Sequence, residues 1–159
     1  MNLRMYFKGN ILILFLTDTR MVSKIFVNLP VKDLEKTKEF FGKLGFTFNA
    51  QFTDDKAACM EMGENIFAML LEEEFFRTFI KTEIADATKT KEVLNALALE
   101  SREKVDDILA KGLAAGGTEP RPAQDHGWMY GRSLEDFDGH IWEFFYMDES
   151  RASEAHDPK

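Results

Sequence analysis

The stretch Leu134–Phe145, LEDFDGHIWEFF, decides the fold and contains the residue on which any account of function depends. Its acidic turn, DFDG at 136–139, leads into an otherwise apolar run that holds one carboxylate, Glu143. Burying an unpaired carboxylate is costly, so such a group is normally paired, protonated or bound to a metal. The sequence therefore predicts a closing strand whose single acid has a specific partner.

The length and composition suit a soluble protein with one compact domain or two small fused halves. The chain has 159 residues and a formal net charge of -8. An acidic surface argues against a nucleic-acid binder, which needs basic residues to meet phosphates. The single cysteine, Cys59, cannot form an internal disulfide, which fits a reducing compartment, and we expect a cytoplasmic protein. The 15 Phe and 8 Met supply apolar surface both for a core and for small-molecule pockets.

The first 20 residues do not fit the pattern of the rest. Their apolar run, Ile11–Leu16, is too short to span a bilayer and short for a signal-peptide core, so no membrane segment is predicted. We interpret residues 1–20 as an added N-terminal extension or the result of a mis-assigned start, with the regular pattern opening at Met21.

The remainder is one pattern of elements written twice. In the first half, a strand over Ser23–Val31 precedes a helix that Asp33 caps and Gly45 ends. Strand candidates follow at Phe46–Phe52, Lys56–Met62 and Asn65–Leu71. In the second half, a strand over Lys91–Glu100 precedes a helix capped by Ser101 and ended at Gly116-Gly117. Strand candidates follow at Thr118–Arg121, Trp128–Leu134 and His140–Met147.

This order predicts an α+β fold with two tandem βαβββ modules inside a single domain, residues 21–148. Module one covers about 21–72 and module two about 91–148. The connecting segment, 73–90, carries three phenylalanines, and we expect it to pack on the domain or its partner rather than act as a lid. Residues 149–159 form a flexible charged tail in this interpretation.

Two stretches resemble a known superfamily. FVNLPVKDLEKTKEFFGKLGF at 26–46 resembles the opening strand and helix of the vicinal oxygen chelate proteins, and LEDFDGHIWEFF resembles their closing DPDG turn and final strand, with Phe137 in place of proline. These proteins include glyoxalases, bleomycin-resistance proteins, fosfomycin-resistance transferases and extradiol dioxygenases. The resemblance implies a curved mixed sheet around a cleft and a homodimer as the usual state.

The resemblance also implies where a metal would bind, and this sequence departs from it. The metal-dependent members take four ligands from the first and last strands of each module. The matching positions here are Phe26, Leu94, a residue near Ala68, and Glu143, and only Glu143 has a ligating side chain. A divalent ion needs several convergent nitrogen or oxygen donors. We therefore expect no cofactor; a divalent metal is possible but disfavoured.

Strand alternation gives a predicted lining for the cleft. Alternate residues of the 128–134 strand face opposite sides of the sheet, so only one of two sets can line the cleft. We prefer the set Trp128, Tyr130 and Arg132 to the set Met129, Gly131 and Ser133, because its side chains can recognise a ligand. Arg132 would pair with Glu143 or bind a ligand's carboxylate or phosphate; packing roles remain equally open. The full predicted lining is Phe26, Asn28, Ala68, Leu94, Ala96, Trp128, Tyr130, Arg132, Glu143 and Phe145.

Three other side chains with possible chemistry receive structural interpretations. His126, beside Asp125, has the residue order of a general base oriented by an acid, but a solvated loop histidine is the simpler reading. His140 should face away from Glu143, and Cys59 is expected in the core.

Three functions remain open at this stage. The first is a protein of the bleomycin-resistance kind that binds an aromatic or amphipathic small molecule in a dimer cleft. The second is a lyase, isomerase or dioxygenase-type enzyme with Glu143 as a base, its pKa raised by desolvation, or as part of a non-standard metal site. The third is a dimeric structural module in which Arg132 holds Glu143.

Overall fold

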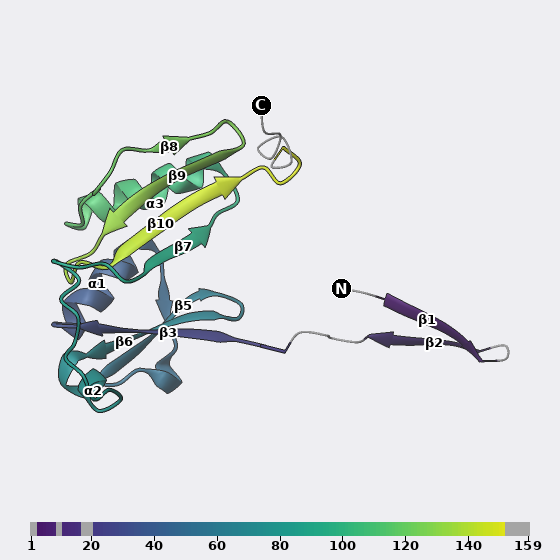
Figure 1. Cartoon of the computed structure of the whole chain (residues 1–159), viewed down its shortest axis with the longest axis horizontal. Coiled ribbons are helices and arrows are strands. Elements are labelled where there is room, and N and C mark those ends of the chain that lie inside the picture. The colour runs from purple at the N-terminus through teal and green to yellow at the C-terminus, as the bar shows by residue number, and fades with distance from the viewer. Residues whose placement is uncertain (1–2, 9–10, 17–20, 152–159) are drawn as a thin grey trace.

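The computed structural model describes residues 3–8, 11–16 and 21–151, with side chains from 21 onward (Figure 1). Within the extension, β1 (Leu3–Lys8) pairs antiparallel with β2 (Ile11–Leu16). Most of the predicted charged tail, 152–159, lies outside the described residues. No described helix is long and apolar enough to cross a bilayer.

Module one contains one helix and a four-stranded mixed sheet in the order β3-β6-β5-β4. β3 (Ile25–Val31) is parallel to β6 (Ile66–Glu72), and β5 (Ala57–Gly63) is antiparallel to β6. The predicted strand at 46–52 is mostly wrong, because only β4 (Thr47–Phe48) pairs with β5. The Asn49 side chain accepts from the Gln51 amide at 3.0 Å and starts the short 3-10 helix η1 (Ala50–Phe52) instead.

The helix α1 (Leu34–Leu44) begins and ends where the sequence predicts. Asp33 caps it by accepting from the Lys36 amide at 3.0 Å, and Gly45 ends it with φ of 103°. That left-handed conformation suits glycine because it has no Cβ.

Module two repeats the arrangement, with sheet order β7-β10-β9-β8. Its elements are β7 (Leu94–Ala98), α3 (Arg102–Ala114), β8 (Gln124–Asp125), β9 (Met129–Glu135) and β10 (Ile141–Met147). The predicted strand at 118–121 is wrong, since only Thr118 bridges, to Glu135. Pro120 in this segment and Pro122 directly after it have no amide to donate to a sheet.

The two modules share one hydrophobic core. The helices α1 and α3 contact each other, and the core includes helix-covered residues of both sheets. Across the junction, the rings of Phe41 and Trp142 lie 4.9 Å apart at 67°, and both side chains are fully buried. Each sheet turns its helix-covered face to this core, so the opposite face, here called the open face, is free of helices of that core.

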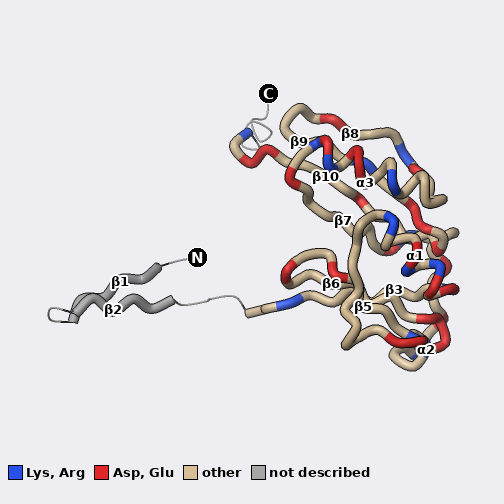
Figure 2. The backbone as a smooth tube through the Cα atoms, turned by 180° about the vertical axis from the view of Figure 1, so that it is seen from behind, with Lys and Arg blue, Asp and Glu red and all other residues tan. Residues whose placement is uncertain are grey.

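The connecting segment packs on the domain, through a helix that the sequence did not predict. This helix, α2 (Glu73–Arg77), contacts β3 and β6. Further along, Lys91 Nζ donates to the Gly139 carbonyl at 2.6 Å and pairs with Glu135 at 2.7 Å. Gly139 is required at this contact, because a Cβ there would lie 2.7 Å from the Ala87 carbonyl carbon. Figure 2 shows charged residues gathered on the helices and loops, whereas β3 and β7 carry none.

Candidate functional site

Glu143 lies on the open face of the module two sheet. In the ladders it is opposite Ser133 of β9 and Ala96 of β7. Residues directly opposite each other project from the same face of a sheet. Ser133, Gly131 and Met129 therefore share the face of Glu143, and the preferred set with Tyr130 and Arg132 is the wrong one.

The partner of Glu143 is Arg121, and the predicted pair with Arg132 is also wrong. Arg121 donates through Nη2 to Glu143 Oε1 and through Nε to Ser133 Oγ at 2.8 Å. Ser133 is 1% exposed, so its hydroxyl is a fixed point for the guanidinium. The Glu143 and Arg121 side chains are 21% and 42% exposed, and the pair is in contact with solvent.

Arg132 belongs to a charged cluster on the helix-covered side. Its Nε and Nη2 donate to both oxygens of Glu119 at 2.9 and 2.8 Å, and its Nη1 donates to Asp106 at 3.0 Å. The Tyr130 hydroxyl donates to the same Asp106 oxygen at 2.7 Å, which lowers the pKa of Asp106 together with Arg132. Desolvation and Asp106 raise the pKa of Tyr130. Both predicted cleft residues therefore fasten α3 to the sheet.

Trp128 precedes β9, and its ring lies 6.5 Å from that of His126. Asp125, the acid expected to orient His126, instead forms a two-bond pair with Arg102 at 2.7 and 2.8 Å. An acid engaged in this way does not orient His126 as a base.

A cavity of about 220 Å³ lies over the Arg121–Glu143 pair. Its apolar wall comes from Met129, Phe145 and Met147, and Gly131 leaves the space beside Phe145 open, since a Cβ there would lie 3.3 Å from the Phe145 Cβ. Of the predicted lining, the structure brings the following residues to this cavity: Ala96, Arg132, Glu143 and Phe145. The Arg132 guanidinium itself is engaged by Glu119 and Asp106. Leu94 has the same alternation and is 50% exposed.

The open face of module one presents Phe26 and Asn28, and neither lines the cavity over the Arg121–Glu143 pair. The Phe26 ring stacks on Phe67, with centroids 4.7 Å apart and planes 12° apart. Ala68 is the exception, because it is fully buried in the core on the helix side. The register places Met69 opposite Asn28, as Glu143 lies opposite Ala96 in module two. Met69, rather than Ala68, is thus the counterpart of Glu143.

The residues at the four ligand positions do not fit the metal that the fold family implies. The positions hold Phe26, Met69, Leu94 and Glu143, a set with one carboxylate and three side chains that offer at best a weak thioether. The carboxylate is already paired with Arg121. Across the described residues, no group of three or more His, Cys, Asp or Glu side chains converges to hold a metal ion.

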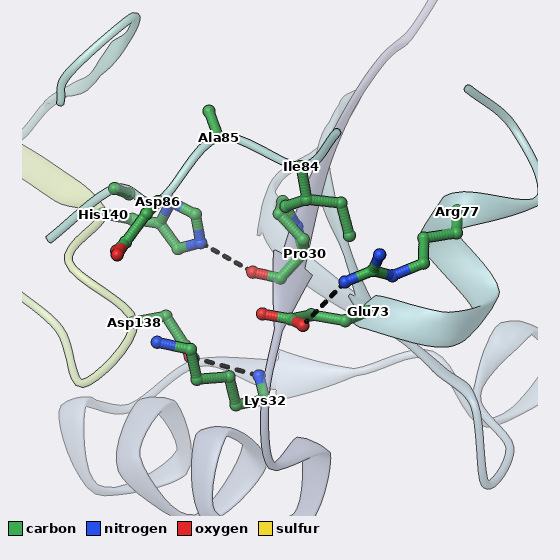
Figure 3. Close-up of a pocket in the computed structure, with 10 residues that line it drawn as sticks. Pro30, Lys32, Glu73, Arg77, Ile84, Ala85, Asp86, Asp138 and His140 are labelled. Atoms are coloured by element: carbon green, nitrogen blue, oxygen red, sulfur yellow. Dashed lines mark hydrogen bonds and ion pairs between the residues drawn. The ribbon is translucent and has the colours of Figure 1, made fainter. Parts of the chain in front are cut away.

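A second cavity lies where the closing turn of module two meets module one (Figure 3). The His140 ring lies 2.8 Å, through Nε2, from the Pro30 carbonyl, and the Lys32 amide donates to Asp138 at 3.1 Å. Arg77 pairs with Glu73 at 3.6 Å on the opposite wall. As predicted, His140 lies away from Glu143. These contacts tie the two modules together, so we assign the junction a structural role.

The buried acid of the closing stretch is Asp136 rather than Glu143. Its carboxylate accepts from the amides of Asp138 and His140 at 3.0 and 2.9 Å and from Trp142 Nε1 at 2.9 Å. Burial raises the pKa of Asp136, while His140 and the Trp142 hydrogen bond act in the opposite direction. This carboxylate organises the turn and does not reach the cavity.

Arg121 is the site residue that the sequence interpretation missed. It lies in EPRP, at the end of the segment predicted as a strand, and reaches Glu143 over 22 positions. The prolines on either side of Arg121 could have indicated its position, because two prolines favour an extended segment beside a sheet over a strand within it.

Comparisons with known proteins agree with this architecture. The family model for the bleomycin resistance protein-like N-terminal region matches residues 24–63. No curated protein matches the chain. Among solved structures, the hypothetical protein SA1046 from S. aureus superposes with a TM-score of 0.68 and 28% identity, covering 80% of this chain and 95% of that one.

Two further structures carry family names. A glyoxalase/bleomycin resistance protein/dioxygenase family enzyme from Burkholderia phytofirmans has a TM-score of 0.64 and 16% identity, covering 77% of this chain and 96% of its own. The genomically encoded fosfomycin resistance protein FosX from Listeria monocytogenes has a TM-score of 0.60 and 20% identity, covering 82% and 98%.

The two four-stranded mixed sheets in tandem βαβββ modules define the glyoxalase/bleomycin-resistance fold. The matched family model, over residues 24–63, agrees with the resemblance of the chain to the vicinal oxygen chelate superfamily.

Proposed function

We propose that this protein binds a small organic molecule with an aromatic or amphipathic body, and that it does so without the standard metal centre. The observation that carries the proposal is the cavity of about 220 Å³ on the open face of module two. It combines an apolar wall of Phe145, Met129 and Met147 with the Arg121–Glu143 ion pair, and Gln124 and Arg132 also line it. Small-molecule sites typically have such an apolar lining with few, fixed polar groups.

A second copy of the chain would complete this site. Three large apolar side chains with open-face alternation are exposed: Phe26 at 45%, Leu94 at 50% and Met147 at 36%. Apolar residues aligned on helix-free sheet faces are typical of surfaces that another layer covers. We therefore propose a homodimer in which the open faces are covered, and sedimentation equilibrium tests it. A chain that stays monomeric at micromolar concentration contradicts the dimer.

Binding is tested by thermal shift with a panel of small aromatic compounds, because a ligand that binds the folded state raises the melting temperature. Phe145→Ala should abolish the shift by removing the cavity wall. Phe79→Ala is the matched control, since Phe79 lies in the connecting segment and is 65% exposed. Equal shifts in both variants, or none in the unmodified protein, would count against the proposal.

The absence of the standard metal centre needs its own test. The protein is purified without chelator from metal-supplemented medium, and the bound metal is measured per chain. We expect far less than one equivalent, because three of the four ligand positions offer no oxygen or nitrogen donor. About one tightly held transition metal per chain would overturn this part of the proposal.

The enzyme alternative, with Glu143 as a base, has less support. A base must be free to reach the proton that it removes. Here Glu143 already accepts from Arg121, which is itself held by Ser133.

A further inference from the structure

The polar group of the cavity is an ion pair with unused hydrogen-bonding capacity on both sides. Arg121 uses Nε for Ser133 and Nη2 for Glu143, and both N–H groups of Nη1 have no protein partner among residues 21–151. Glu143 uses Oε1, and its Oε2 likewise has no partner in this described part of the chain. A guanidinium offers five N–H donors and a carboxylate about four acceptor sites, so each partner retains capacity.

The charges of the pair cancel, which restricts what the cavity accepts. A ligand carboxylate attracted to Arg121 meets the Glu143 carboxylate beside it, and a ligand ammonium attracted to Glu143 meets Arg121. Like charges at such short range are unfavourable, most of all where surrounding apolar groups limit screening. Met129, Phe145 and Met147 provide that apolar surrounding. The site therefore discriminates against ligands with a full charge at the polar end.

Building on the proposed function, we propose that the Arg121–Glu143 pair anchors a neutral ligand group that accepts from the guanidinium and donates to the carboxylate. Carboxamides, ureas and hydroxy-carbonyl groups have this chemistry, with the rest of the ligand lying on the Met129, Phe145 and Met147 wall. Arg121 thus takes the position of the fixed cation in a site whose ligand set does not suit a metal. Because Ser133 and Glu143 hold the guanidinium before ligand arrives, little ordering is required on binding.

The test uses three probes of the same shape and different charge: phenylacetamide, phenylacetate and phenethylamine. Their dissociation constants are measured by isothermal titration calorimetry on the full chain. The unmodified protein should bind phenylacetamide at least about tenfold more tightly than either charged probe, since a tenfold preference needs only one well-made interaction.

Two variants that each leave one charge should switch the preference in opposite directions. In Glu143→Gln the guanidinium loses its competitor, and phenylacetate should become the best of the three probes. In Arg121→Gln the carboxylate is left alone, and phenethylamine should become the best. Arg77→Gln is the matched control, because Arg77 lies on α2, pairs with Glu73 and does not line this cavity, so it should leave the order of the probes unchanged. Circular dichroism verifies that each variant is folded.

The outcomes separate this inference from the proposed function. Equal binding of all three probes, or an unchanged order in both variants, overturns the anchor while the binding function stands. Failure of all three probes to bind at millimolar concentration overturns the anchor, whereas the proposed function then stands or falls on the aromatic panel and the Phe145→Ala comparison.

Discussion

Two helical glycines in equivalent helices should respond oppositely to the same substitution. Gly42 of α1 has no heavy atom within 4 Å of the place where a Cβ would be. Gly112 of α3 packs on β9, and a Cβ there would lie 2.3 Å from Leu134 Cδ2 and 2.9 Å from Cδ1. Leu134 is fully buried, so any shift that makes room for the Cβ must take place within the core.

The magnitude follows from two terms. Replacing glycine by alanine inside a helix is worth about 1 kcal/mol through the backbone, and this term applies to both variants. Overpacking a filled core costs about 1–3 kcal/mol, and this term applies to Gly112→Ala alone. Gly42→Ala should therefore raise the free energy of unfolding by up to about 1 kcal/mol, and Gly112→Ala should fall below it by about 1–3 kcal/mol.

The assay is urea unfolding at one fixed protein concentration, followed by the fluorescence of the buried Trp142. In thermal unfolding the same difference corresponds to about 2–4 °C for each kcal/mol. A Gly112→Ala variant as stable as Gly42→Ala, with the fold intact, would refute the close packing of α3 on β9. That result would also weaken the assignment of which sheet face is open.

Three further predictions concern other parts of the molecule. Trp142→Phe removes the indole donor to Asp136 and should cost about 1–3 kcal/mol of unfolding free energy, the usual cost of an unsatisfied buried acceptor; no loss of stability would contradict the buried-acid assignment. The folded-state pKa of Asp106 is lowered from 3.8, so its stabilising contribution is present above that pH and lost as the pH falls. Asp106→Asn should thus destabilise at pH 7 and much less near pH 3; an effect of Asp106→Asn that does not change with pH would exclude the linkage. Cys59 is 1% exposed, and burial raises the pKa of its thiol. A thiol reagent at pH 8 should therefore react with it only as fast as the protein opens. Immediate reaction would show that the strand that carries Cys59 is accessible.

The fold was largely predictable because its signals are local. The Asp33 cap and the Gly45 end of α1 can be predicted from a few neighbouring residues, and the closing turn and strand can be predicted from 12 consecutive positions. The repeated element order then gives two modules. The error at Thr118–Arg121 occurs where Pro120 and the following Pro122 lack the amide that a strand would donate, so only Thr118 forms a bridge.

The site was less predictable because it depends on register and on long-range pairing. Alternation correctly separates the residues of β9 into two sets, but only the ladder with β10 shows that Ser133, not Arg132, shares the face of Glu143. The prediction that Ala68 lines the cleft is wrong for the same reason, because a shift by one residue moves a side chain to the other side of the sheet. The partners of Arg121 lie 12 and 22 positions away, and no local pattern encodes that contact.

The most direct test of the proposed site is NMR of the methionine methyl groups during titration with phenylacetamide. Met129 and Met147 line the cavity, whereas Met60 is fully buried in the core and serves as an internal reference. The account predicts saturable shifts of the Met129 and Met147 signals, an unmoved Met60 signal, and loss of the shifts in Arg121→Gln. If the signals of other methionines shift saturably while those of Met129 and Met147 do not move, the binding site lies elsewhere and the account is contradicted.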